Sequence, residues 1–142
     1  MMHVIPYRSF HVSALTIQNS QQYMSDFIKP EYCKALEQAG PAYTVMDDGE
    51  VIACAGLAEQ WPTRATAWTL ISDKITGLKF ARLHKMVLRF LDMQDYLRIE
   101  MTVDHEFEQG HRWAKLLGFQ WEGLMRKYNP NGCDCDLYSR VK

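Results

Sequence analysis

Three side chains able to accept a proton follow predicted strands. Glu59 comes shortly after the strand 51–57, and Asp104 and His105 come directly after the strand 97–103. Imidazole titrates near neutral pH, and a carboxylate accepts a proton when a site orients it. These residues are our candidates for a general base. The alternative for His105 is a surface loop position, and Glu59 can equally be a solvated turn residue.

A second group of residues surrounds the start of a predicted helix. Thr76 is a suitable N-cap, Gly77 follows it, and apolar residues at helical spacing run from 78 to 91. Free amide groups and the positive end of the helix dipole bind anions at such a start. Basic side chains are frequent here: Lys74, Lys79, Arg82, Lys85 and Arg89. They predict an anion site, which Asp73 would oppose; the alternative is an ordinary capped helix with a solvated basic face.

Two further residues could contact a ligand. Trp61 lies in the polar loop 58–64 and is the aromatic residue that we expect to be exposed, beside Arg64, where it could contact a partner or a substrate amine. Glu100 lies in the middle of its strand, and it either faces water or pairs with a neighbouring base. The other large aromatic residues are expected mostly in the core.

The cysteines indicate neither a disulfide framework nor a metal centre. Cys33, Cys54, Cys133 and Cys135 are too few and too scattered for a secreted disulfide-rich domain. Cys133 and Cys135 supply half of a four-ligand zinc site, and no second pair stands at a diagnostic spacing. The sequence favours a turn at 129–132 followed by a strand on which both cysteines share one face. We therefore expect no metal.

Composition sets the remaining bounds. The chain has 142 residues, of which 47% are hydrophobic and 23% charged, as in an ordinary globular domain, so we expect a single domain over 1–142. Sixteen basic and seventeen acidic residues give a net charge of −1, which makes nucleic-acid binding an unlikely class. No apolar run approaches the ~20 residues that span a bilayer, and the first residues lack the pattern of a signal peptide. A cytoplasmic location without membrane contact is expected.

The first half of the chain alternates strands and helices. A strand is predicted at 2–8, and the stretch from Ser9 to about Ala39 is mostly helical in pattern. Pro30 divides this stretch into two helices and begins the second. The strands 43–46 and 51–57 flank Asp48-Gly49, a strong signal for a hairpin.

The second half continues the alternation. A strand at 65–71 precedes the helix that begins near Gly77, and the strand 97–103 precedes a short helix at 106–117. A final hairpin pairs 119–127 with 134–141. The predicted order is β-α-α-β-β-β-α-β-α-β-β, which describes an α+β domain whose mostly antiparallel mixed sheet has about seven strands flanked by helices.

A strand, a short helix and Leu117-Gly118-Phe119 opening another strand resemble the end of the GNAT superfamily of acetyl-CoA-dependent N-acetyltransferases. In that pattern Gly118 ends the helix with a positive φ, and Phe119 turns inward to cover it. The order of elements resembles the GNAT topology over almost the whole chain. The resemblance implies that the fourth and fifth strands diverge and hold acetyl-CoA, with its pyrophosphate at the start of the long helix. The implied cofactor contacts are Leu70, Ile71, Ser72, Lys74, Thr76, Gly77, Lys79 and Arg82.

The sequence departs from the family pattern in three places. The usual pyrophosphate loop is Arg/Gln-x-x-Gly-x-Gly/Ala, and only Gly77 and Ala81 echo it. The tyrosine that protonates the departing thiolate in many GNAT enzymes is Ala114 here, and alanine cannot act as an acid. The asparagine that often precedes this helix is also missing. The chemistry then depends on positioning and on deprotonation of the amine, for which Glu59, Asp104 and His105 are the candidates.

A narrower resemblance is to the small GNAT-like proteins of short-tailed phages. Ile71-Ser72-Asp73 and Gly77-Leu78-Lys79 are similar to that variant, which also lacks the tyrosine. Two functions follow. One is transfer of an acetyl group from acetyl-CoA to a primary amine of a protein lysine, an N-terminus or a small molecule. The other is an inactive GNAT-fold phage protein that binds a host partner or belongs to the virion, in which case the location is the host cytoplasm or the virion. The family also implies a homodimer through the C-terminal strands.

Overall fold

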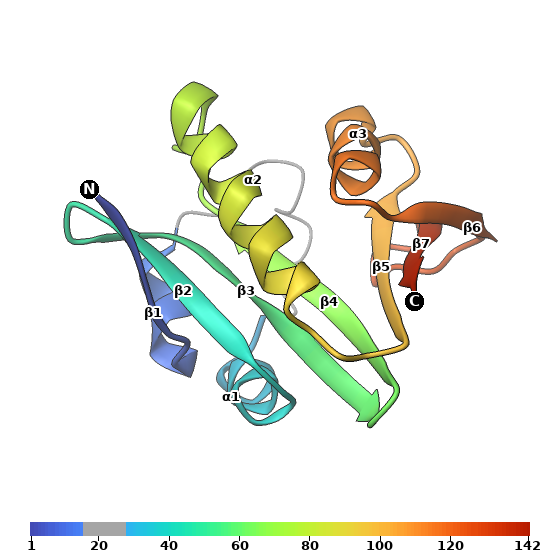
Figure 1. Ribbon diagram of the computed structural model, residues 1–142, viewed down its shortest axis with the longest axis horizontal. Coiled ribbons are helices and arrows are strands. Elements are labelled where there is room, and N and C mark those ends of the chain that lie inside the picture. The colour runs from blue at the N-terminus through green and yellow to red at the C-terminus, as the bar shows by residue number, and fades with distance from the viewer. Residues whose placement is uncertain (16–27) are drawn as a thin grey trace. The chain divides into compact units, whose positions relative to one another are not determined.

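The computed structural model describes residues 1–15 and 28–142, and Figure 1 shows the arrangement of their strands and helices. One sheet contains seven strands in the order β1-β2-β3-β4-β5-β7-β6. Its strands are β1 (Met2–Pro6), β2 (Ala42–Asp47), β3 (Glu50–Trp61), β4 (Arg64–Ile71), β5 (Arg98–Asp104), β6 (Gln120–Met125) and β7 (Cys135–Val141). The pair β4–β5 is parallel, and the pairs β1–β2, β2–β3, β5–β7 and β6–β7 are antiparallel. The predicted α+β class with a mostly antiparallel mixed sheet is confirmed.

The helices occupy the predicted places. They are the 3-10 helix η1 (Ser9–Ala14), α1 (Pro30–Gln38), α2 (Gly77–Asp92) and α3 (Glu108–Leu116). Pro30 stands in the first turn of α1 after Lys29 as N-cap, which confirms the predicted start of that helix. The preceding helical stretch is η1 as far as Ala14, and the rest of that prediction lies outside the described residues. In the part of the chain that is described, no helix has the length and hydropathy needed to span a bilayer.

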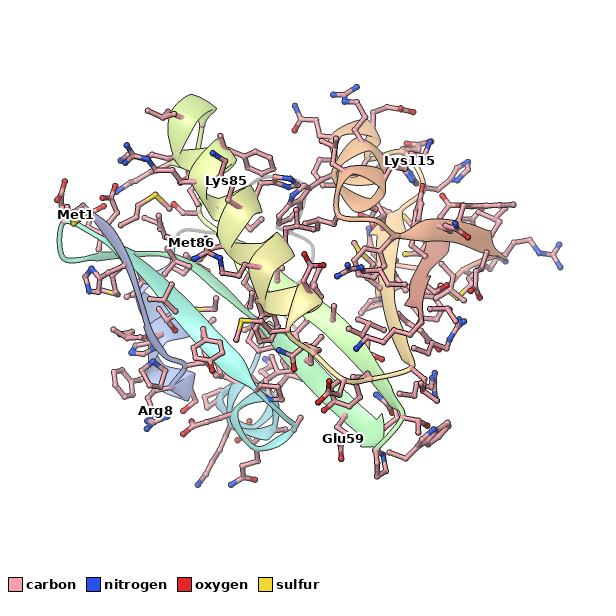
Figure 2. All side chains as sticks on the ribbon, viewed as in Figure 1. Met1, Arg8, Glu59, Lys85, Met86 and Lys115 are labelled. Carbon is pink, nitrogen blue, oxygen red and sulfur yellow. The ribbon has the colours of Figure 1, made fainter. Side chains whose placement is uncertain are left out.

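The chain forms two compact units. The first contains Met1–Glu59 and Ala67–Thr76, and the second contains Gln60–Thr66 and Gly77–Lys142. The strand β3 passes from the first unit to the second after Glu59, which Figure 2 labels near the end of that strand. The strand β4 passes back after Thr66. A single domain over 1–142 stays a prediction.

The first unit is organised around a small apolar core and a tight hairpin. Its buried side chains are Tyr7, Val12, Leu15, Cys33, Leu36, Cys54 and Leu70. Asp48 and Gly49 have φ values of 51° and 83° and join β2 to β3, as the sequence predicts. The strand β1 ends at Pro6 rather than near Arg8, because Arg8 already serves as the N-cap of η1.

In the second unit, α3 ends in the way that Leu117-Gly118-Phe119 predicts. Gly118 has a φ of 88°, and its N–H donates to the carbonyl of Lys115 at 3.0 Å. The N–H of Phe119 donates to the carbonyl of Ala114 at 3.0 Å, and the Phe119 side chain is buried. These two bonds form a Schellman motif, which satisfies the last carbonyl groups of the helix.

The prediction for the final hairpin is wrong in one detail. Cys133 does not share a strand face with Cys135, because β7 begins only at Cys135. The side chain of Asn129 closes the preceding turn: its Oδ1 accepts the N–H groups of Asn131 at 3.0 Å and Cys133 at 2.8 Å. Cys133 is therefore an exposed turn residue, whereas Cys135 is buried.

Candidate active site

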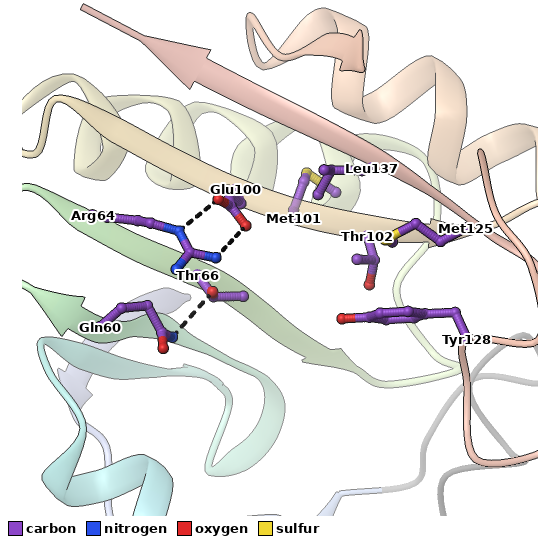
Figure 3. Close-up of a pocket in the computed structure, with 9 residues that line it drawn as sticks. All are labelled: Gln60, Arg64, Thr66, Glu100, Met101, Thr102, Met125, Tyr128 and Leu137. Atoms are coloured by element: carbon purple, nitrogen blue, oxygen red, sulfur yellow. Dashed lines mark hydrogen bonds and ion pairs between the residues drawn. The ribbon is translucent and has the colours of Figure 1, made fainter. Parts of the chain in front are cut away.

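A pocket of about 460 Å³ lies within the second unit, on the strands β4 and β5 (Figure 3). The parallel ladder of these strands pairs Arg64 with Arg98 and Thr66 with Glu100. Its lining residues are Gln60, Arg64, Thr66, Glu100, Met101, Thr102, Met125, Tyr128 and Leu137. The pocket thus combines one ion pair and several hydroxyl groups with an apolar wall, as small-molecule sites commonly do.

A chain of ion pairs forms the charged wall of the pocket. Glu100 Oε1 accepts from Arg64 Nε at 2.6 Å and from Arg98 Nε at 2.7 Å, and its Oε2 accepts from Arg64 Nη2 at 3.0 Å. Arg98 also donates to both oxygens of Glu122, at 2.8 and 2.7 Å. Ser139 Oγ donates to Glu122 as well. Such bidentate, charge-assisted bonds fix side chains firmly.

The electrostatics of this wall make Glu100 a poor base. The hydrogen bond from Arg64 outweighs burial and holds the pKa of Glu100 below its ordinary value. The bonds from Arg98 and Ser139 lower the pKa of Glu122 to about 2. Both carboxylates therefore stay ionised near neutral pH, and Glu100 acts in pairing rather than in proton transfer. The sequence left open whether Glu100 faces water or pairs with a base, and the structure shows the pairing.

Two exposed aromatic residues lie at or near the pocket: Tyr128 lines it, and Trp61 contacts Arg64, which also lines it. The Trp61 side chain is 54% exposed, and the guanidinium carbon of Arg64 lies 5.0 Å from the centre of a Trp61 ring. The predicted exposure of Trp61 beside Arg64 is confirmed. Tyr128 is also exposed, and Figure 3 shows its hydroxyl directed into the pocket next to Thr102.

A buried carboxylate, Asp136, organises a second cluster in the same unit. Its Oδ2 accepts from His105 Nδ1 at 2.8 Å, and its Oδ1 accepts from Trp121 Nε1 at 2.8 Å. Burial alone would raise the pKa of Asp136, but these two hydrogen bonds outweigh it, and the pKa is lowered. Asp136 in turn raises the pKa of His105. The pair therefore resembles the orienting carboxylate and imidazole of many proton-transfer sites.

His111 also belongs to this cluster, and its two hydrogen bonds show which tautomer it adopts. Its Nε2 lies 2.8 Å from the carbonyl oxygen of His105, which can only accept, so Nε2 carries a proton. Its Nδ1 lies 2.7 Å from the hydroxyl of Tyr138, which donates to it when His111 is neutral. The bond to the His105 carbonyl attaches the start of α3 to the residue that follows β5.

The sequence did not reveal Asp136, Trp121, His111 or Tyr138 as parts of one cluster. Asp136 lies in β7, far along the chain from His105. The antiparallel pairing of β5 with β7, which sets Val103 opposite Asp136, brings the two residues together. Trp121 is 58% exposed even though its N–H is bound, so the expectation that most large aromatics are core residues does not hold for it. The one signal available in the sequence was a carboxylate, Asp136, within one predicted strand, together with a histidine, His105, directly after another.

The three candidate bases lie in different surroundings. His105 is half exposed, and its Nε2 has no hydrogen-bond partner in the described part of the chain. Asp104 ends β5, and its Oδ1 accepts from Asn129 Nδ2 at 3.2 Å and lies 3.5 Å from Cys135 Sγ. Glu59 is exposed and belongs to the first unit, where its N–H donates to the carbonyl of Ala39. Asp104 and His105 thus lie together in the second unit. Their catalytic roles stay predictions.

The predicted cofactor residues are divided between the two units. Leu70, Ile71 and Ser72 are buried in the first unit, where Ser72 Oγ accepts the N–H of Lys74 at 3.1 Å. Lys74 Nζ lies 3.6 Å from a carboxylate oxygen of Glu50. Thr76 ends that unit. In the second unit, α2 begins at Gly77, whose φ is 56°. The same helix carries the exposed Lys79 and Arg82. Binding of a cofactor by this set stays a prediction.

Position 114 and the possible metal ligands are the last features of the site. Ala114 is completely buried in α3, so this position offers neither a titratable group nor space for a larger one. Within residues 1–15 and 28–142, no group of three or more His, Cys, Asp or Glu side chains could hold a metal ion.

No protein-family model and no curated protein matches the chain. Solved structures match it closely in fold. Ard1 from Thermoplasma volcanium superposes with a TM-score of 0.82 at 13% identity, covering 99% of this chain and 97% of that one. A GNAT family acetyltransferase from Elizabethkingia anophelis with acetyl-CoA bound gives 0.72 at 12% identity, covering 99% and 98%. The ribosomal-protein-S5-alanine acetyltransferase from Vibrio fischeri gives 0.69 at 19% identity, covering 99% and 92%. From end to end, the chain has the fold of the GNAT acetyltransferases.

Proposed function

We propose that the protein is an N-acetyltransferase that moves the acetyl group of acetyl-CoA to a primary amine. The observation that carries the proposal is the match of fold over 99% of the chain to an acetyltransferase with acetyl-CoA bound. The pocket on β4 and β5 supports it, because it offers a site of small-molecule size on the strands between which the family resemblance places acetyl-CoA. Acetyl-CoA is then a cosubstrate, and the amine belongs to a protein lysine, an N-terminus or a small molecule.

Two parts of this chain would hold the cosubstrate. Lys74, Thr76, Gly77, Lys79 and Arg82 would bind the pyrophosphate through positive charge and free amide groups. The backbone at Leu70 and Ile71 would hold the thioester, including the carbonyl oxygen that gains negative charge. The neutral amine attacks the carbonyl carbon, the C–S bond breaks, and the electron pair leaves with the sulfur. Because Ala114 cannot supply a proton, the thiolate takes one from water.

His105 is the base that the geometry favours among the three candidates. Asp136 holds its Nδ1, and Nε2 points away from that bond and is able to accept the ammonium proton of the acceptor. Asp104 accepts a hydrogen bond from Asn129, and Glu59 belongs to the first unit, apart from the Asp136 cluster of the second. Asp136 is then a positioning residue for His105.

Calorimetric titration with acetyl-CoA tests the proposal. We expect micromolar binding by the unaltered protein and its loss in a variant with Lys74, Lys79 and Arg82 changed to Ala. A matched control changes Lys85 and Arg89, which are exposed basic residues of the same helix, and should bind as the unaltered protein does. Release of free CoA thiol in the presence of an amine then reports turnover. An absence of heat at millimolar acetyl-CoA would contradict the proposal.

A second candidate is an inactive GNAT-fold protein, such as a phage protein that binds a host partner or belongs to the virion. Two observations favour it: Ala114 replaces the usual acid, and Lys74 already pairs with Glu50 in the first unit. In that case the protein binds neither acetyl-CoA nor CoA. The titration above therefore separates the two candidates directly.

A further inference from the structure

His111 is the member of the Asp136 cluster whose ring is held at both nitrogens. Its side chain is only 14% exposed. Its Nε2–H donates to the carbonyl of His105 at 2.8 Å, and its Nδ1 accepts from the hydroxyl of the buried Tyr138 at 2.7 Å. A ring bonded at both nitrogens has no free atom to offer a substrate, but it can fix the group to which it is bonded.

The group that His111 holds is the main chain of the candidate base. The N–H of His105 donates to the carbonyl of Asp134 at 3.0 Å, and the carbonyl of His105 accepts from His111. Both peptide groups of this residue are therefore held, one by the segment before β7 and one by α3. The His105 side chain is 54% exposed, and among the described residues its one hydrogen bond is from Nδ1 to Asp136. The direction of Nε2 thus depends on where the main chain places the ring.

Resting on the proposed function, we infer that His111 is a positioning residue for the base His105, and that the Tyr138 hydroxyl holds the His111 ring in the orientation that this requires. Only a ring with its proton on Nε2 can donate to the His105 carbonyl. The hydroxyl of Tyr138 binds the opposite, unprotonated nitrogen, and the ring is fixed between the two partners.

The position of His105 matters because a base must meet its proton at one atom. The base nitrogen has to lie within hydrogen-bond reach of the amine, at about 2.6–3.2 Å. A misplacement of about 1 Å can cost on the order of 100-fold in rate. The alternative is a purely structural role, in which His111 and Tyr138 attach α3 to β7 and contribute to stability alone. The two roles differ in what happens to His105 when His111 is changed.

The first test is spectroscopic and needs no substrate. His111→Phe removes the donor to the His105 carbonyl, whereas His111→Gln keeps an amide N–H that can donate to it. Both variants lack the imidazole, so a difference between them reports the hydrogen bond and not the loss of a titratable group. NMR should show His105 titrating at lower pH in His111→Phe than in His111→Gln, because a loosened ring bonds less well to Asp136.

The other charged groups around His105 are the same in both variants. Asp136 faces it from β7, Asp134 from the segment before β7, and Glu106 from the turn that leads to α3. Asp136, through its hydrogen bond, is the main cause of the raised pKa of His105, and the other two carboxylates add to it. A difference in titration therefore follows from geometry. Equal midpoints in the two variants would overturn the inference.

The second test is kinetic. The kcat of His111→Phe should lie about 10- to 100-fold below that of His111→Gln, with the same KM for acetyl-CoA in both. Tyr138→Phe frees only one end of the His111 ring, and it should lower kcat by less than His111→Phe does. His3→Gln, at an exposed position of β1, is the matched control and should behave as the unaltered protein. In a protein that carries Asp136→Asn, His111→Phe should slow the reaction no further, because both changes act through His105.

Three results of the kinetic test would overturn the inference. Equal kcat values in His111→Phe and His111→Gln, with a lower urea midpoint for the Phe variant, would make His111 a purely structural residue. Additive losses in the double variant would mean that His111 acts on something other than His105. If His111→Phe does not fold, Tyr138→Phe carries the test, and an unchanged kcat with an unchanged titration of His105 would then be the contradicting result.

The two tests also separate the failure of this inference from that of the proposed function. A protein that gives no heat with acetyl-CoA, but in which His105 titrates differently in His111→Phe and His111→Gln, would refute the acetyltransferase and support the positioning of His105 by His111. Turnover of acetyl-CoA with equal kcat values in the two variants would refute the inference and leave the acetyltransferase standing.

Discussion

At the scale of single residues, the second unit contains two sets of charges with opposite consequences. Glu100 accepts hydrogen bonds from Arg64 and Arg98 and stays ionised. It therefore orients the side chains of the pocket and does not transfer a proton. Asp136 accepts a hydrogen bond from His105 and raises the pKa of His105 above its ordinary value. Glu100 is thus paired with permanent cations, whereas Asp136 is paired with a titratable group.

The first prediction concerns Asp136→Asn. Removal of the negative charge lowers the pKa of His105, so the histidine resonances followed by NMR should titrate at lower pH than in the unaltered protein. If His105 is the base, the rise of kcat/KM with pH should move in the same direction. Asp134→Asn is the control, since Asp134 contributes less to the raised pKa of His105. An unchanged titration of His105 would contradict the hydrogen bond.

The same pair predicts how stability depends on pH. Because the pKa of His105 is raised above 6.5 in the folded state, its contribution is fully present below 6.5 and is lost as the pH rises through the folded pKa. Because the pKa of Asp136 is lowered below 3.8, its contribution is present above 3.8 and is lost as the pH falls through the folded pKa. The difference in free energy of unfolding between the unaltered protein and Asp136→Asn should therefore be largest from 3.8 to 6.5. A difference that grows above that range would be inconsistent with the pair.

A further prediction concerns Glu100→Gln. The amide keeps the shape but leaves Arg64 and Arg98 without a carboxylate, and the Glu100 side chain is only 13% exposed. Loss of charge-assisted hydrogen bonds at a partly buried site should lower the free energy of unfolding by about 1–3 kcal/mol. Urea denaturation measures it. Glu106→Gln, at an exposed turn, should change stability by less than about 0.5 kcal/mol. Equal effects of the two changes would mean that the ion pairs contribute nothing.

At the scale of elements, local signals predicted the fold well and the clusters poorly. The Asp-Gly turn, Pro30 and Leu117-Gly118-Phe119 each act within a few residues, so their structures could be predicted from the sequence. The pocket and the Asp136 cluster depend on the pairing of β5 with β4 and β7, whose members are distant in sequence. For the same reason the sequence identified His105 but missed Asp136. Cys133 was misplaced because the side-chain bonds of Asn129, rather than strand alternation, determine its position.

The Schellman motif at the end of α3 gives a prediction at this scale. Gly118→Ala keeps both hydrogen bonds but forces a Cβ into a φ of 88°, where it would also lie 3.4 Å from Arg140 Nε. The cost of this conformation for an L-residue is about 1–2 kcal/mol, and the urea midpoint should fall accordingly. Gly123→Ala is the control, because a Cβ there meets nothing within 4 Å and no positive φ is recorded. A Gly118→Ala protein as stable as the control would contradict the role given to Gly118.

At the scale of the whole molecule, the fold and the site give different kinds of information. The match to GNAT acetyltransferases over 99% of the chain comes with 12% identity to the structure that contains acetyl-CoA. At that identity the match shows the fold alone, so the function has to be argued from this chain's own side chains. The Arg64–Glu100 and Asp136–His105 pairs are observed in this chain itself. They form a basis for experiments that the fold alone does not provide.

The last prediction concerns cooperativity. The strands β3 and β4 each belong to both compact units, since the boundaries at Glu59/Gln60 and Thr66/Ala67 fall inside them. Unfolding of either unit therefore removes strand residues from the other, and we expect one cooperative transition, as in a single domain. Hydrogen exchange in increasing urea tests this at the amides of Leu57 in β3 and Tyr138 in β7. Both should exchange through openings with the same free energy and the same dependence on urea. A lower opening energy with a shallower slope at one amide would show that its unit unfolds separately.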